Sequence, residues 1–277
     1  MPQTIAFQGE PGAYSHQACR ETYPESTAMP CRTFEEAIEA VRSGAADLAM
    51  LPVENSTFGR VADIHHLLPG SGLHIIGEAF VRVKIALLAL PGTSLPQVRR
   101  AMSHPMLLGQ CRGFLEAHGI ERVTGADTAG SARQVAENAE PQTAALASAL
   151  AGDIYGLDIL ADGIEDEGDN TTRFLVMAPA PDMTRRGDAG MMTSFVFTVR
   201  NIPAALYKAM GGFATNGVNM TKLESYMVGG TFSATQFYAD VEGHPDDANL
   251  ALALEELDYF TSEVNILGVY PRDPRRD

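Results

Sequence analysis

Short apolar runs alternate with helical patterns over the first two-thirds of the chain. Strands are predicted at residues 4–7, 46–53, 84–90, 122–125 and 143–147, and helices at 33–41, 106–118 and 131–138. In residues 33–41 the apolar side chains recur at helical spacing, and Thr33 with Glu36 has the pattern of a capping box. This alternation is typical of an α/β layer fold with mostly parallel strands, whose ligand sites lie at the carboxyl ends of strands.

The pattern changes after residues 178–190, where prolines and glycines without apolar periodicity predict a linker. Beyond it, strands are predicted at 193–199, 218–227, 231–241 and 262–269, and helices at 204–215 and 246–259. Pro203 falls at the first turn of the first of these helices, where its missing N–H costs little. The order βαββαβ predicts a ferredoxin-like module. We therefore expect a first domain at 1–178, a linker at 179–191 and a second domain at 192–277.

Composition narrows the choice of partners. The 277 residues carry 20 basic and 35 acidic side chains, a net charge of −15, which argues against nucleic acid or an anionic membrane as the main partner. Three widely spaced cysteines fit neither a disulfide framework nor a zinc site and predict a reducing compartment. Neither a signal peptide nor a membrane helix is predicted, and we expect a cytoplasmic protein.

Four polar strings lie beside predicted turns. They are 54–57 (Glu-Asn-Ser-Thr), 103–105 (Ser-His-Pro) with Gln110, 128–131 (Thr-Ala-Gly-Ser) and 170–174 (Asn-Thr-Thr-Arg-Phe). None has the spacing of a metal site, a nucleophile elbow, a phosphate loop or a dinucleotide fingerprint, so neither a metal nor a cofactor is expected. Hydroxyls, amides and helix starts of this kind bind carboxylates without net positive charge. The sequence thus predicts a site for a small carboxylic acid.

Five motifs in order give the chain a resemblance to the prephenate dehydratase family over essentially its whole length. They are Phe-Gln-Gly-Glu-Pro-Gly-Ala-Tyr-Ser at 7–15, Pro-Val-Glu-Asn-Ser at 52–56, Ser-His-Pro at 103–105 with Gln-Cys at 110–111, Asp-Thr-Ala-Gly-Ser-Ala at 127–132 and Thr-Arg-Phe at 172–174. The resemblance implies two α/β lobes similar to type 2 periplasmic binding proteins, an active site in the cleft between them, and a C-terminal ACT module. It also implies conversion of prephenate to phenylpyruvate, water and carbon dioxide without a cofactor.

The resemblance assigns Thr172 as the proton donor to the leaving hydroxyl. A threonine hydroxyl is a weak acid, so we expect Thr172 to act as a hydrogen-bond donor rather than to transfer its proton. Glu54 is a better acid if burial raises its pKa. Otherwise we expect Glu54 to tune the site without touching the substrate. Arg173 adds positive charge if it faces the cleft. The residues expected to bind substrate are Asn55, Ser56, Ser103, Gln110, Thr128, Ser131, Arg173 and Phe174.

Simpler interpretations stand beside these assignments. Glu54-Asn55-Ser56 alone is equally typical of a helix cap. His104 is expected to set the turn before Pro105 rather than to act as a base, and Cys111 to be a core residue. His65 and His66 diverge on a helix and cannot ligate one metal together. The acidic run at 165–169 lacks the spacing of an EF-hand and predicts a solvated loop.

The second module resembles an ACT domain that binds L-phenylalanine as feedback inhibitor. Two motifs depart from the family pattern: Ala204 replaces the glycine of Gly-Ala-Leu after Pro203, and Tyr226-Met227 follow Glu224-Ser225 in place of Arg-Pro. A Cβ at residue 204 could crowd the approach of the effector. The expected effector-binding residues are Asn201, Pro203, Ala204, Ala205, Leu206, Asn219, Glu224 and Ser225. A homodimer or homotetramer through this module is expected, and a dimerisation domain that has lost its ligand is the alternative.

Two other functions stay open at this point. Arogenate has an amino group where prephenate has a keto group, and a few side chains around the substrate tail could decide between the two acids. A catalytically silent amino-acid sensor is the alternative from another class. An intact Thr172 and the absence of an export signal count against the sensor.

Overall fold

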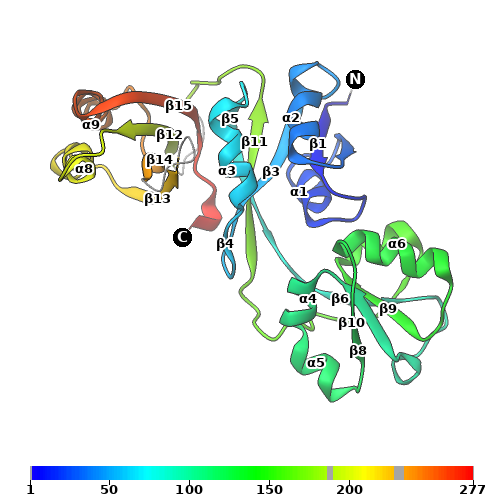
Figure 1. The fold of residues 1–277 in the computed structure, drawn as a ribbon. Helices are drawn as coiled ribbons and strands as arrows, with labels where there is room; N and C mark the ends of the chain where they lie inside the picture. Colours follow the sequence, from blue (N-terminus) through cyan, green and yellow to red (C-terminus); the bar gives the residue numbers. More distant parts are fainter. Residues whose placement is uncertain (1, 186–189, 228–233, 277) are drawn as a thin grey trace. The chain divides into compact units, whose positions relative to one another are not determined.

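The computed structural model describes residues 2–185, 190–227 and 234–276 (Figure 1). Its chain divides into two compact units, Met1–Val61 with Phe80–Phe174 (unit 1), and Ala62–Ala79 with Leu175–Asp277 (unit 2). Among the described residues, no helix is both long and apolar enough to cross a membrane.

Unit 1 contains a parallel sheet in the order β3-β1-β2, and β4 forms a hairpin with β3. Its elements are β1 (Thr4–Gln8), α1 (Tyr14–Thr22), β2 (Thr27–Cys31), α2 (Phe34–Arg42), β3 (Leu48–Asn55), β4 (Gly59–Arg60) and the start of β11 (Thr171–Ala178), which lies beside β3. The capping box predicted for α2 forms in part. Thr33 Oγ1 accepts from Glu36 N, but the Glu36 carboxylate accepts from Arg32 N instead of Thr33 N.

A second sheet of unit 1 has the order β10-β6-β9-β7-β8. Its elements are β6 (Ala86–Ala89), η2 (Leu95–Gln97), β7 (Arg100–Ser103), α4 (Pro105–Gln110), α5 (Arg112–Ala117), β8 (Glu121–Thr124), α6 (Thr128–Asn138), β9 (Thr143–Ala147), α7 (Ala149–Tyr155) and β10 (Asp158–Asp162). Strand β7 is parallel to both neighbours, whereas β6 is antiparallel to β9 and β10. The prediction of mostly parallel strands therefore holds for the order β3-β1-β2. In the second sheet, two of the four strand pairings are parallel and two are antiparallel.

The helix predicted at 106–118 is two short helices that meet at Cys111. Cys111 has a non-helical backbone (φ −108°, ψ 21°), and the neighbouring Gly109 and Gly113 have low helix propensity. Its side chain is fully buried among apolar residues that include Leu107 and Leu115, so the core position predicted for Cys111 is confirmed. His104 caps the first helix through Nδ1, which accepts from Met106 N, in line with its predicted turn role.

Unit 2 confirms the predicted order βαββαβ. The elements are β12 (Met191–Val199), α8 (Ala205–Thr215), β13 (Met220–Met227), β14 (Ala234–Glu242), α9 (Ala248–Phe260) and β15 (Thr261–Pro271), followed by η3 (Pro274–Arg276). The strands form an antiparallel sheet in the order β13-β14-β12-β15, and α8 and α9 pack against each other (Figure 1). Residues 186–189 of the predicted linker and 231–233 of the predicted strand lie outside the described residues.

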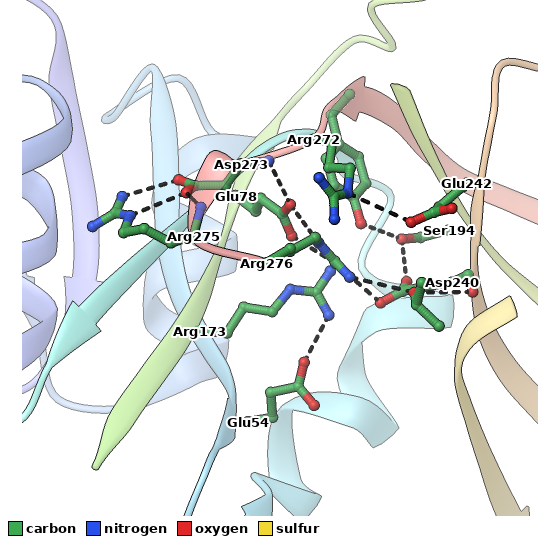
Figure 2. Close-up of polar contacts among 12 residues, drawn as sticks. Glu54, Glu78, Arg173, Ser194, Asp240, Glu242, Arg272, Asp273, Arg275 and Arg276 are labelled. Atoms are coloured by element: carbon green, nitrogen blue, oxygen red, sulfur yellow. Dashed lines mark hydrogen bonds and ion pairs between the residues drawn. The ribbon is translucent and has the colours of Figure 1, made fainter. Parts of the chain in front are cut away.

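Unit 2 also contains a segment that the sequence placed in the first domain. It comprises α3 (Ala62–Leu67), η1 (Leu68–Gly70) and the first part of β5 (His74–Arg82). His65 Nδ1 lies 2.8 Å from the Tyr226 hydroxyl, and Gly268 of β15 pairs with Ile75. Arg276 donates two bonds of 2.7 Å to the buried Glu78 carboxylate and lies 3.6 Å from Asp240 (Figure 2). These contacts join residues 62–79 to the C-terminal module.

Candidate active site

The polar strings predicted from the sequence follow the ends of strands in unit 1. Asn55 ends β3, Ser103 ends β7 and Thr128 begins α6, whereas Thr172 lies at the start of β11. Strands β3 and β11 are neighbours, so residues 115 and more positions apart in the sequence come into direct contact. The structure thus joins the first and last of the four strings.

The Asn55 carboxamide has all of its hydrogen-bonding capacity used. Its Oδ1 accepts from the backbone N–H groups of Thr57 and Phe58, both at 3.0 Å. Because that fixes the oxygen, Nδ2 faces the other way and donates to Asn170 Oδ1 at 2.5 Å and to Thr172 Oγ1 at 3.0 Å. A carboxamide offers two acceptor lone pairs and two donor hydrogens, so Asn55 has no further bond to offer a ligand.

The Thr172 hydroxyl is oriented by this arrangement. Its oxygen accepts from Asn55, and within the described part of the chain its hydrogen meets no acceptor. Thr172 is half-buried. Its hydroxyl is thereby prepared to donate, and a bond accepted at the oxygen strengthens the bond that it donates.

Ser56 fixes the end of β3 to β11. Its backbone N–H donates to Thr171 O at 2.8 Å, and its hydroxyl accepts from Thr171 N and donates to Asp169 O, both at 2.9 Å. The Ser56 hydroxyl hydrogen is therefore committed to the backbone, and the residue holds the Thr172 strand in place.

Glu54 and Arg173 form an ion pair on the opposite faces of their strands from Asn55 and Thr172. Arg173 Nη1 lies 2.8 Å from Glu54 Oε1, and the arginine side chain is only 2% exposed (Figure 2). Successive residues of a strand point to opposite faces, so Arg173 does not add its charge beside the Thr172 hydroxyl. The Arg173 guanidinium favours the ionised form of the Glu54 carboxyl group over the protonated acid.

A cavity of about 430 Å³ lies beside the turn that follows Asn55. Its lining residues are Thr57, Phe58, Pro105, Met106, Gly109, Gln110, Asp166 and Glu167. The turn of Thr57 and Phe58 that forms one wall is the turn whose N–H groups bind Asn55. The Gln110 Oε1 atom is buried, and no described residue gives it a hydrogen-bond partner. Gln110 therefore lines a cavity with a side chain that the fold has left uncommitted.

Three other predicted substrate residues are occupied by the fold. Ser103 is fully buried and donates to Leu146 O at 2.7 Å, and Ser131 donates to Asp127 O at 2.6 Å. Phe174 is 1% exposed and packs in the interior. The hydroxyl hydrogens of Ser103 and Ser131 are therefore used by backbone oxygens, and Phe174 is a core side chain. Thr128, half-buried at the first turn of α6, differs from them because none of the bonds of the described residues uses its hydroxyl.

The 7–15 motif forms the turn between β1 and α1. Gly12 has φ +91°, and a Cβ there would lie 2.7 Å from Ala151 Cα. Ser148 donates to Gly12 O at 2.6 Å, and Tyr155 donates to Pro11 O at 2.8 Å, two contacts that the sequence did not indicate. The motif thus fixes the first sheet of unit 1 to α7 of the second.

The cysteines and histidines of the described residues form no metal-binding group. Burial raises the pKa of Cys19 and of Cys111 to about 12, so both thiols stay protonated. His65 is bonded to Tyr226, and the described residues contain no group of three or more His, Cys, Asp or Glu side chains placed for a metal ion.

The predicted effector residues lie around the start of α8 and on β13 in unit 2. Asn201, Pro203 and Ala204 are exposed, and Ala204 has φ +64°, a conformation that favours glycine. The N-cap position of α8 is Ala204, which has no side-chain oxygen to bind the first N–H groups. Glu224 pairs with Lys222 at 3.3 Å, and Ser225 is exposed beside it.

Comparisons with known proteins agree with the sequence motifs. The family profile described as prephenate dehydratase matches residues 5–182. A Komagataeibacter europaeus protein named bifunctional N-acyl-homoserine lactone acylase/prephenate dehydratase is 52% identical over 98% of this chain and 97% of its own. Arogenate dehydratase/prephenate dehydratase 1 of Arabidopsis thaliana is 38% identical, covering 97% of this chain and 72% of its own.

A solved structure is also similar over nearly the whole chain. The prephenate dehydratase of Arthrobacter aurescens in complex with L-Phe is 33% identical, with a TM-score of 0.88 over 97% of this chain and 90% of that one. The mixed α/β fold predicted from the sequence is thereby confirmed. The likeness to periplasmic binding proteins and the assignment of an ACT module stay predictions.

Proposed function

Because this chain belongs to the prephenate dehydratase family, we propose that it catalyses the decarboxylating dehydration of prephenate to phenylpyruvate. The observation that carries the proposal is the bond from Asn55 Nδ2 to Thr172 Oγ1, which leaves the Thr172 hydrogen as a donor. In the reaction, the bond from the ring to its carboxylate breaks and its electron pair enters the ring. The ring carbon–oxygen bond breaks, and the oxygen keeps its own hydrogen and takes up one proton from solvent to leave as water.

In the proposed mechanism, one residue donates a hydrogen bond to the leaving oxygen and the others hold it or the substrate in position. Thr172 donates to the leaving oxygen, Asn55 orients it, and the ion pair of Glu54 and Arg173 supports the strands from behind. Gln110, through its Nε2 donor, and Thr128, through its hydroxyl, are the groups that we assign to the substrate carboxylates, because neither side chain is committed to the fold. Aromatisation of the ring supplies the driving force, so the proposed reaction needs no metal or organic cofactor.

The test of this function is turnover of prephenate and arogenate by the purified chain. We expect aromatic product and carbon dioxide to appear in equal amounts from prephenate, at a higher kcat/KM than from arogenate. A higher kcat/KM with arogenate would make the chain an arogenate dehydratase, the activity named first for the Arabidopsis relative. No product from either acid would contradict the enzyme and favour a silent sensor.

A second activity is named for the Komagataeibacter relative, which shares 52% of its residues with this chain. We therefore include N-acyl-homoserine lactone hydrolysis as a second candidate. Release of free homoserine lactone by the purified chain tests it. An unchanged acyl compound after a period sufficient for full prephenate turnover would exclude it.

For regulation, we propose that unit 2 is an ACT module that binds L-phenylalanine and lowers turnover. The Arthrobacter enzyme was solved with this amino acid, and here the uncapped start of α8 offers backbone N–H groups to a carboxylate.

We also propose a homodimer or homotetramer through this module, since Tyr207 of α8 and Tyr259 of α9 are both 81% exposed. Three buried cysteine thiols suit the cytoplasm.

Replacing Ala204 with Gly is expected to stabilise the protein by about 1 kcal/mol, because the left-handed conformation is strained for alanine. The exposed Ala204 methyl group contributes little packing. Urea unfolding measures the stability, and calorimetry with phenylalanine should show equal or tighter binding. A lower free energy of unfolding in Ala204→Gly would mean that the methyl group is needed where it is.

A further inference from the structure

Asn170 contacts Asn55, and the mechanism proposed above gives Asn170 no role. Its side chain is 2% exposed, and its Oδ1 accepts from Asn55 Nδ2 at 2.5 Å, the shorter of the two bonds that this nitrogen donates. We propose that Asn170 is a positioning residue for the reaction: its carbonyl oxygen holds the Asn55 amide so that the second N–H hydrogen points at Thr172 Oγ1.

The backbone around Asn170 gives this acceptor a fixed place. Its own carbonyl oxygen accepts from Val83 N at 2.8 Å, and the residues on both sides of it are bonded to Ser56. A side chain on a backbone fixed in this way presents its oxygen in one position with little cost in entropy.

The Asn55 amide needs this acceptor because Nδ2 carries two hydrogens in a partly buried place. One hydrogen has Asn170 and the other has Thr172. Without Asn170, the first hydrogen loses its partner, and the NH2 group turns toward another acceptor while Thr57 and Phe58 still hold the Asn55 oxygen. Such a turn removes the bond to Thr172 and leaves its hydroxyl free to rotate away from the substrate.

This inference rests on the proposed function and adds a residue to it. It predicts a loss in kcat with little change in KM, because Asn170 acts on a hydrogen bond that matters in the transition state and does not touch the substrate. Asn170→Ala is expected to lower kcat by about 10- to 100-fold, the range common for residues that orient a reacting group. Asn170→Asp keeps an acceptor oxygen in the same place and should stay within about threefold of the parent.

The decisive experiment is a double-mutant cycle with Thr172→Val, which removes the hydroxyl that Asn170 is said to orient. We expect Asn170→Ala to cost at least tenfold in kcat in the parent and less than about twofold in Thr172→Val, because the two residues act through one bond. Asn216→Leu is the control. Asn216 is a half-buried asparagine of unit 2 bonded to Gly212 O and Glu256, and its loss should leave kcat unchanged in both backgrounds.

Equal losses from Asn170→Ala in the two backgrounds would overturn the proposal, since they would mean a general structural role. A rise in KM at constant kcat, or an Asn170→Asp variant as impaired as Asn170→Ala, would also overturn it. A parent that converts neither prephenate nor arogenate would instead contradict the proposed function itself. Thermal unfolding of each variant identifies any that is not folded, and if Asn170→Ala is one of them, Asn170→Ser replaces it in the cycle.

Discussion

Replacing Thr172 with Val is expected to lower kcat for phenylpyruvate formation by about a hundredfold or more, the usual contribution of one hydrogen-bond donor aimed at developing negative charge. Valine has the shape of threonine without the hydroxyl, so it removes the group that we assign as donor to the leaving oxygen. The fold should tolerate the change, because Thr172 is half-buried and its oxygen has one partner, Asn55. Formation of phenylpyruvate from prephenate at saturation measures the effect.

The matched variant is Thr172→Ser, which retains the hydroxyl and the bond from Asn55. We expect it to keep most of the parent's kcat, within about tenfold, since serine loses only the methyl group that restricts rotation. Full turnover by Thr172→Val would remove Thr172 from the chemistry. Equal losses of kcat in Thr172→Val and Thr172→Ser would mean that the presence of the hydroxyl alone does not explain the role of Thr172.

Replacing Gly12 with Ala is expected to lower the free energy of unfolding by about 2–4 kcal/mol, the sum of backbone strain and steric overlap. The left-handed φ of +91° disfavours any side chain, and the new Cβ would meet the Ala151 backbone at 2.7 Å. Because Ala151 cannot withdraw without moving α7, the bond from Ser148 to Gly12 O should weaken as well. Urea unfolding gives the value.

Gly44 provides the control for this prediction. It also has a left-handed φ, +77°, but a Cβ there would meet nothing within 4 Å. Gly44→Ala should therefore cost only the strain, about 1 kcal/mol. A loss in Gly12→Ala no greater than in Gly44→Ala would show that the contact with α7 is not tight in solution.

Much of the fold follows from local pattern, and the exceptions have physical causes. The strands of the first sheet and the order βαββαβ could be predicted because each element has its own apolar face. Strand β2 could not, because it holds Pro30 and lies at the edge of its sheet with few buried positions. The helix at 106–118 was predicted as one element because periodicity continues through Cys111, although the backbone does not.

The contacts among the predicted site residues could not be predicted from the sequence. The motifs indicated Asn55 as a ligand of the substrate carboxylates and Thr172 as the donor, yet residues 57, 58, 170 and 172 together use every hydrogen-bonding position of Asn55. No local pattern shows which side chain at the end of one strand meets which on another. Ser103 was likewise predicted to bind substrate from its place in the Ser-His-Pro motif, but only the structure shows that its hydroxyl donates to Leu146 O.

The central claim is that the Thr172 hydroxyl donates to the oxygen that leaves the ring, and a crystal structure with an unreactive prephenate analogue tests it most directly. We predict that Thr172 Oγ1 will lie within about 2.6–3.2 Å of that oxygen while still accepting from Asn55 Nδ2. An analogue whose ring oxygen is bound by another side chain, with Thr172 out of reach, would contradict the account.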